Sequence, residues 1–180
     1  MSKKTGVLIV NLGTPDSPST SDVKKYLSEF LNDPRVIDIN PLGRKILVNG
    51  IIVPTRGPKS AKEYKKLFKI GNGASPLLTY GENLLKLVRE IGHQQFDVEL
   101  AMRYGNPSMD SVLEKMRLAN YDQIILFPLY PQYASATTGS IIEKAFKIMS
   151  RWWVIPEIKI IGQFYDCLLY TSPSPRDETK

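Results

Sequence analysis

Two short, uninterrupted runs of apolar residues constrain the fold of this chain most strongly. They are GVLIVNL at residues 6–12 and IILF at residues 124–127, and a turn rich in glycine or proline follows each. A strand exposed on one face alternates apolar and polar residues, whereas a strand buried on both faces of a parallel sheet is apolar throughout. We therefore expect both runs to be inner strands of a parallel sheet.

Helical patterns separate the predicted strands. Ser19 and Asp22 form a capping box ahead of an amphipathic stripe that ends near Leu31. Residues 97–104 alternate like a strand near a sheet edge, and residues 157–163 predict a fourth strand. Further helices are predicted after Ser75, around Met109–Met116 and over residues 138–151, the last with Ile141, Ile142, Ala145, Phe146 and Met149 inside. This order predicts an α/β fold, with a doubly wound, parallel, four-stranded sheet in one domain.

The segment 32–59 is long for a connection and allows two interpretations. Its apolar stretch Ile46–Val53 surrounds Asn49-Gly50, which local rules favour as a hairpin turn. The alternative is a broken helical lip over a cleft. The next helix is predicted to begin at Ser60, with Glu63 completing a capping box. Its inward-facing residues are expected to be Ala61, Tyr64, Leu67 and Phe68.

Charge and composition narrow the class of protein. The 180 residues carry a net charge of +6, which favours anionic partners, but no Lys/Arg run exceeds two residues, so nucleic-acid binding is not supported. The single cysteine, Cys167, excludes an internal disulfide and a multi-cysteine iron–sulfur site in this segment and fits a reducing compartment. No segment reaches the ~18 apolar residues of a membrane span. We expect a cytoplasmic protein that contacts a membrane only at its surface.

The chain offers few candidates for catalysis. His93 is the only histidine, and its polar surroundings after a helix end favour a solvated side chain. One histidine cannot supply a multi-histidine metal site. No Walker-type phosphate loop is present, and Gly71 and Gly73 lack the preceding strand of a dinucleotide fingerprint, so a nucleotide enzyme is disfavoured.

Binding residues instead gather where the strands end. Ligands of open α/β sheets lie beyond the carboxyl ends of the strands. Tyrosines there offer stacking faces, small hydroxyl groups and helix N-termini donate to carboxylates, and Arg56 provides a fork matched to a carboxylate. These residues suit a flat, anionic, aromatic ligand. Each of three residues also has a purely structural explanation. Tyr64 could be a core residue, Arg56 a surface charge and Ser75 a helix N-cap. The predicted loops are residues 11–16, 56–75 and 130–140, the last including Tyr130, Gln132, Tyr133, Ser135, Thr137, Thr138 and Ser140.

The last segment, CLLYTSPSPRDETK at residues 167–180, has no helical period. We interpret it as a foreign end, such as translated adapter sequence at a truncation, and place the domain at residues 1–166. The alternative is a natural disordered terminus.

Six motifs occur in one order along the chain and together resemble ferrochelatase, the enzyme that inserts ferrous iron into a porphyrin at the end of haem synthesis. The resemblance covers about residues 5–166. The motifs are VLIVNLGTPDSP at 7–18, VKKYLSEFLNDPRVID at 23–38, RGPKSAKEYKKLF at 56–68, GASPLLTY at 73–80, AMRYGNPS at 101–108 and FPLYPQYASATTGS at 127–140.

The resemblance implies two similar Rossmann-like domains, the halves of a class II chelatase, with the porphyrin in the cleft between them. This chain matches the first half. Leu12 corresponds to an apolar residue facing the macrocycle, and Arg56, Tyr64 and Ser75 match porphyrin-contacting residues. Residues 41–57 correspond to an apolar lip through which a porphyrin passes to or from a membrane surface, which weakens the hairpin interpretation. One wall of the cleft would hold Tyr130, Gln132, Tyr133, Ser135, Thr137 and Thr138.

The departures from the family define what this chain is expected to lack. Ferrochelatases carry the metal-inserting histidine in an SAHSLP-like motif of the second domain, and His93 does not correspond to it. Two pyrrole protons must leave as iron enters, so a base must stand over the ring, and distorting the ring would require both walls. We expect no catalytic residue and no metal site in this chain, which would be an inactive fragment without its C-terminal domain.

Iron and porphyrin would be substrates of the intact enzyme, with no cofactor in this segment. The alternatives are a non-catalytic tetrapyrrole-binding module and a chelatase for another metal such as cobalt.

Overall fold

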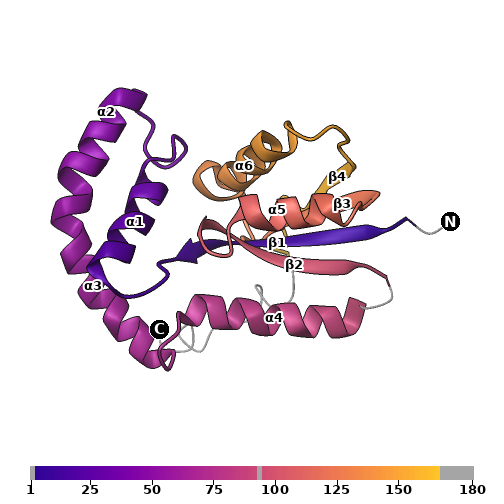
Figure 1. Cartoon of the computed structure of the whole chain (residues 1–180), viewed down its shortest axis with the longest axis horizontal. Helices are drawn as coiled ribbons and strands as arrows, with labels where there is room; N and C mark the ends of the chain where they lie inside the picture. The colour runs from indigo at the N-terminus through magenta and orange to yellow at the C-terminus, as the bar shows by residue number, and fades with distance from the viewer. Residues whose placement is uncertain (1–2, 93–94, 167–180) are drawn as a thin grey trace.

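The computed structural model describes residues 3–92 and 95–166 and is built on a parallel four-stranded sheet (Figure 1). The strands lie in the order β2-β1-β3-β4, and every neighbouring pair is parallel. The two apolar runs form the two inner strands, and the alternating segment forms an edge, as predicted. The strands are β1 (Thr5–Thr14), β2 (Asp97–Gly105), β3 (Gln123–Pro128) and β4 (Glu157–Ile160).

Helices cover both faces of the sheet, which confirms the doubly wound arrangement (Figure 1). On one face α5 (Met109–Leu118) and α6 (Ser140–Met149) pack against Leu8, Val10 and Leu126. On the other face α4 (Pro76–Gly92) packs against Val7, Ile9 and Leu100. The sheet therefore has two apolar layers of core, one on each side.

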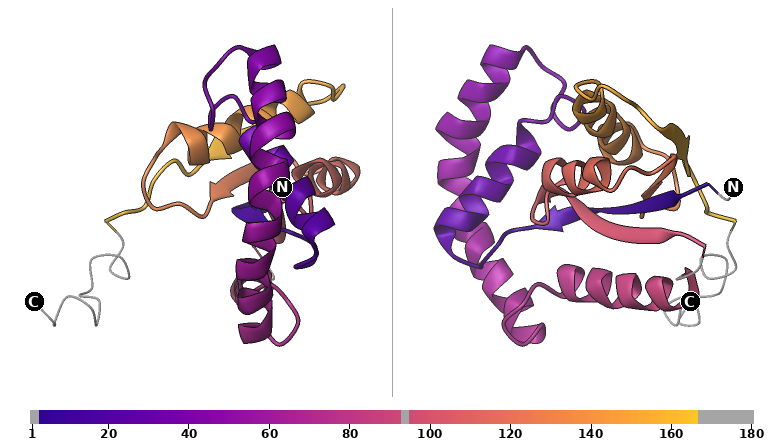
Figure 2. Two further views of the ribbon diagram at one scale, coloured as in Figure 1. Left: turned by 90° about the vertical axis from the view of Figure 1, so that its left-hand side faces the viewer. Right: turned by 45° about the vertical axis from the view of Figure 1, so that its right-hand side comes forward.

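A second helical layer stands at the carboxyl ends of the strands. It contains α1 (Thr20–Leu31), α2 (Pro41–Ile46), the π-helical turn η1 (Leu47–Ile52) and α3 (Val53–Ile70). In Figure 2, α2, η1 and α3 form one continuous rod beside α1. The rod buries Val48, Val53, Gly57, Ala61 and Phe68 at helical spacing.

This rod corrects two sequence predictions. Asn49-Gly50 does not form a hairpin turn, because the chain runs helically through η1 into α3. Ser60 and Glu63 do not cap a helix start, because α3 has already run from Val53 and contains Pro58. The burial of one face along the whole rod stabilises a continuous helix more than the local sequence favours a turn at Asn49-Gly50 or a helix start at Ser60.

Two residues that were expected to be buried in the core are exposed to solvent. Leu67 and Phe146 are each 46% exposed, because the buried stripes pass through Phe68 on α3 and through Ala145 on α6. The helix predicted from residue 138 begins at Ser140, after the π-helical turn η2 (Ser135–Gly139).

Gly13, the next-to-last residue of β1, allows a close approach between two strands. Its φ is +110°, and a Cβ there would lie 1.8 Å from the Tyr104 carbonyl oxygen on β2. Only glycine allows the two strand ends to approach this closely. Within the residues that the structure describes, no helix is long and apolar enough to cross a membrane.

Candidate functional site

The buried carboxylate of Asp33 joins three elements at the carboxyl end of the sheet. Asp33 follows α1 and is 5% exposed. Its Oδ2 atom accepts hydrogen bonds from Arg103 Nη2 at 2.5 Å, from the Tyr104 hydroxyl at 2.8 Å and from Ser140 Oγ at 2.5 Å. Its Oδ1 atom accepts from the backbone N–H of Arg35 at 2.8 Å. The carboxylate thus ties the end of α1 to β2 and to the start of α6.

The electrostatics of this network favour an ionised Asp33. Burial alone would raise its pKa, but the hydrogen bonds from Ser140, from the Arg35 backbone and from Tyr104, together with the charge of Arg103, lower the pKa below its ordinary value. Arg103 also donates from Nε to Ser140 Oγ at 2.7 Å and lies 4.4 Å from the centre of the Tyr104 ring. A buried network satisfied in this way holds a single geometry.

An aromatic cluster lies beside the Asp33 network. The Tyr26 ring of α1 stacks on Phe30 at 6.2 Å and meets Tyr64 of α3 edge-on at 6.1 Å. Phe30 meets Tyr104 of β2 edge-on at 5.1 Å. Tyr130, after β3, is close enough to Tyr104 for Tyr104 to raise the pKa of the Tyr130 hydroxyl. Burial is the main cause that raises the pKa of Tyr26, Tyr104 and Tyr130, so these hydroxyls stay protonated at neutral pH.

Two predicted site residues carry buried polar atoms with no partner. In the described part of the chain, the Tyr130 hydroxyl and Thr138 Oγ1 are buried and accept or donate no hydrogen bond. Buried polar groups are almost always hydrogen-bonded. These two atoms therefore have unused bonding capacity where the sequence predicts a ligand.

The other predicted residues between positions 130 and 140 lie in the same segment, between β3 and α6. Gln132, Tyr133 and Ser135 are exposed, whereas Thr137 is half-buried. Leu12 is half-buried near the end of β1. All of these positions lie beyond or at the carboxyl ends of the inner strands, as predicted.

Arg35 fastens the segment before α6. Its Nη1 atom donates to Ser135 Oγ at 3.1 Å, and its Nε atom forms an ion pair with Glu143 of α6. A Cβ at Gly139 would lie 3.0 Å from Arg35 Nη1 and 3.1 Å from the Tyr133 hydroxyl. The absent side chain at Gly139 leaves room for both groups.

Two predicted residues do not join this cluster. Arg56 was expected on a loop, but it lies within α3 with its side chain exposed. Ser75 is 6% exposed and lines a separate cavity of about 400 Å³ with Thr14, Asp16 and Asn106. That cavity shares no lining residue with the aromatic cluster.

Asp33, Arg103 and Tyr104 were not among the residues predicted from the sequence to have a functional role. Their signal was an Arg-Tyr pair at the end of a strand and an aspartate just after the first helix. His93 and the segment 167–180 lie outside the described residues, so the predictions for them stay as stated.

The fold and site define an α/β protein with an aromatic, hydroxyl-bearing cluster at the carboxyl end of its sheet. The family model of ferrochelatase matches residues 4–175 of this chain. The chain therefore belongs to the ferrochelatase family.

Curated relatives agree with this assignment. A ferrochelatase of Chromobacterium violaceum is 42% identical over 167 residues, which are 91% of this chain and 45% of that protein. Ferrochelatases of Francisella tularensis subsp. tularensis and subsp. novicida are each 43% identical over 164 residues, which are 91% of this chain and 49% of those proteins. The chain spans about half the length of these relatives.

Proposed function

We propose that the intact protein inserts Fe²⁺ into a porphyrin to make haem and that this chain supplies one wall of the porphyrin cleft. Family membership supports the reaction class. The position of this wall is supported by two unpartnered buried hydroxyls, on Tyr130 and Thr138, in the segment between β3 and α6. Tyr130 lies near Tyr26 and Tyr104 of the aromatic cluster. A porphyrin offers both a flat aromatic face and carboxylates for such groups.

The wall binds and orients the macrocycle, and the proton acceptor lies elsewhere. The raised pKa values of Tyr104 and Tyr130 make these phenols donors at neutral pH rather than bases. Asp33 is ionised, but both of its oxygens already accept hydrogen bonds. The metal-inserting histidine and its acidic partner belong in this proposal to the C-terminal domain, so the chain alone is inactive. Iron and porphyrin are both substrates, and this segment requires no cofactor.

The lip supplies the route for an apolar substrate. Leu42 is 68% exposed, Ile46 61% and Ile51 57%, and all three lie on α2 and η1. Such side chains favour contact with a membrane surface from the cytoplasmic side.

The test combines porphyrin binding with iron insertion. Titration of protoporphyrin and coproporphyrin, followed at the Soret band, measures binding by the chain and by the full-length protein. Fe²⁺ insertion is then assayed for both. We expect insertion only by the full-length protein, and weaker porphyrin binding when Arg56→Ala is combined with Tyr130→Ala.

Three outcomes would change the proposal. Turnover by the 180-residue chain would contradict its inactivity. Binding without insertion by the full-length protein would favour a tetrapyrrole-binding module. Faster insertion of Co²⁺ than of Fe²⁺ would favour a chelatase for another metal.

A further inference from the structure

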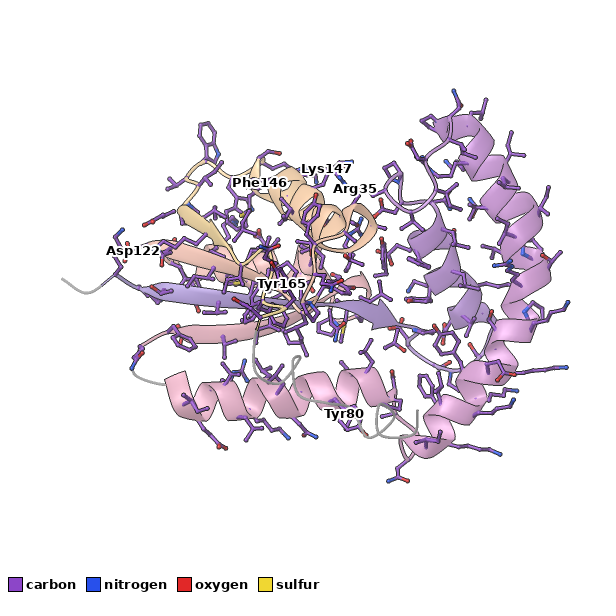
Figure 3. The ribbon with its side chains drawn as sticks, turned by 180° about the vertical axis from the view of Figure 1, so that it is seen from behind. Arg35, Tyr80, Asp122, Phe146, Lys147 and Tyr165 are labelled. Atoms are coloured by element: carbon purple, nitrogen blue, oxygen red, sulfur yellow. The ribbon has the colours of Figure 1, made fainter. Side chains whose placement is uncertain are left out.

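A second cavity, of about 650 Å³, is lined by Asp33 and Arg103 but by none of the residues of the aromatic cluster. Its walls come from the end of α1, from α2 and η1, and from the outward face of α6. None of the residues predicted to contact a porphyrin lines it. Figure 3 labels Lys147 on α6, one of its lining residues. The cavity has the size of a small-molecule site, about 300–1,000 Å³.

Arg44 is the most informative residue in this cavity. It is 9% exposed, and its Nη1 atom donates to the carbonyl oxygens of Ile37 and Ile39, each at 3.1 Å. Residues 3–92 and 95–166 provide no carboxylate partner for it and no acceptor for its Nε and Nη2 atoms. Buried charged groups are almost always paired. The two backbone contacts fix the guanidinium so that its free Nε–Nη2 edge can receive an anion.

More cations approach from α6 across the cavity. Lys144 and Lys147 are three residues apart, which places them on one side of α6, and Arg151 lies in the turn that follows the helix. Lys144 pairs with Asp110 at 2.6 Å. Within the described ranges, Lys147 and Arg151 form no ion pair, and neither does Lys45 on α2.

Three of the four acidic residues that line the cavity already form ion pairs. Asp33 is paired with Arg103, Asp110 with Lys144, and Glu143 with Arg35. Glu29 accepts a hydrogen bond from the backbone N–H of Gly105 at 3.0 Å. Four cations without an ion pair, Arg44, Lys45, Lys147 and Arg151, therefore share the cavity with one unpaired carboxylate, Glu29, which leaves an excess of positive charge.

We propose that this cavity binds a small anion that carries phosphate groups. The free edge of Arg44 matches two oxygens of a phosphate in a bidentate contact, and the lysines and Arg151 supply point charges around it. Several separated cations suit a ligand with more than one phosphate better than a single carboxylate. This inference rests on the cavity alone and does not depend on the porphyrin proposal.

Pyrophosphate is the probe for this site. Isothermal titration of the 180-residue chain at low ionic strength should show saturable binding of one pyrophosphate. The double variant Lys147→Gln/Arg151→Gln removes one exposed charge from α6 and one from the turn after it. It should weaken binding about tenfold or more, the effect of losing one charge-assisted hydrogen bond or more. The matched control, Lys62→Gln/Lys65→Gln on exposed positions of α3, removes the same charge and should leave binding unchanged.

Arg44→Gln tests the central group but also removes support from two carbonyl groups. A thermal melt monitored by circular dichroism comes first, and the α6 double variant provides the test if Arg44→Gln does not fold. The proposal is overturned by the absence of saturation at about 10 mM pyrophosphate, well above a weak Kd of about 1 mM. It is also overturned by equal weakening in the α3 control, or by citrate binding more tightly than pyrophosphate.

Discussion

Asp33 and Arg103 form the most buried ion pair in the described part of the chain, with side-chain exposures of 3% and 13%. Replacing Asp33 by Asn would leave the guanidinium of Arg103 buried without its counter-charge. Breaking a buried pair on one side costs about 3–5 kcal/mol. We predict a loss of this size in the free energy of unfolding of Asp33→Asn, measured by urea denaturation.

The control for this prediction is Glu63→Gln. Glu63 pairs with Lys66 at 2.9 Å on exposed α3. Exposed pairs contribute less than about 1 kcal/mol, so this variant should unfold almost as the wild type does. Equal losses in both variants would show that Asp33 has no special structural role.

The lowered pKa of Asp33 also predicts acid sensitivity. Its pKa in the folded chain lies below the value of about 4 for an unfolded aspartate, so the unfolded state binds the proton more tightly. The stabilisation is complete above the unfolded pKa and is lost as the pH falls through the folded pKa. Asp33→Asn should therefore flatten the stability–pH curve below about pH 4. A curve parallel to the wild type's would contradict this role.

For single residues, the sequence predicts position best where a residue directly follows a recognisable strand. Tyr130 and Thr138 could be placed at a ligand-binding edge because they follow an apolar strand. Asp33 could not be predicted as the centre of a network, because its partners are 70, 71 and 107 residues away. Such a contact depends on how the sheet brings β2 and α6 to the end of α1.

Among the elements, the rod of α2, η1 and α3 was the hardest to predict. Asn49-Gly50 is a strong local turn signal, but residues 48, 53, 57, 61 and 68 are buried at a spacing that fits one long helix packed on α1. Tertiary packing outweighs local preference here, as it often does. The strands were easier to predict because a short, uninterrupted apolar run fits few structures other than a strand buried on both faces.

The exposed lip of this rod, on α2 and η1, leads to a prediction about membrane contact. Replacing Leu42, Ile46 and Ile51 by Ser removes apolar surface without disturbing a buried contact, because each is more than half exposed. We expect lower co-sedimentation with phospholipid vesicles and unchanged thermal stability. A matched triple replacement of exposed Leu67, Ile70 and Leu87 on α3 and α4 should leave vesicle binding unchanged. Vesicle binding equal to that of the wild type in the lip variant would contradict the lip's role.

For the whole molecule, the α/β class and the parallel sheet followed from alternating strand and helix signals. The positions of Arg56 and Ser75 relative to the rest of the site could not be predicted from these signals, because they depend on the orientation of α3 and on the loop into α4. The chain matches about half of each curated relative, and large apolar side chains are exposed at Ile160 and Tyr165, near its second edge strand. In our proposal the C-terminal domain covers such surface and completes the cleft.

The central claim is that the aromatic end of the sheet binds a porphyrin, and its most direct test is a Soret titration of the full-length protein. The variant Tyr130→Phe/Thr138→Val deletes the two unpartnered buried hydroxyls, and Tyr80→Phe on exposed α4 is the control. Because the free chain does not use these hydroxyls, their loss should not lower its stability. We predict about tenfold weaker porphyrin binding, from the loss of two hydrogen bonds of about 0.5–1.5 kcal/mol each, and no change in the control. A double variant that binds porphyrin as tightly as the wild type would contradict the claim.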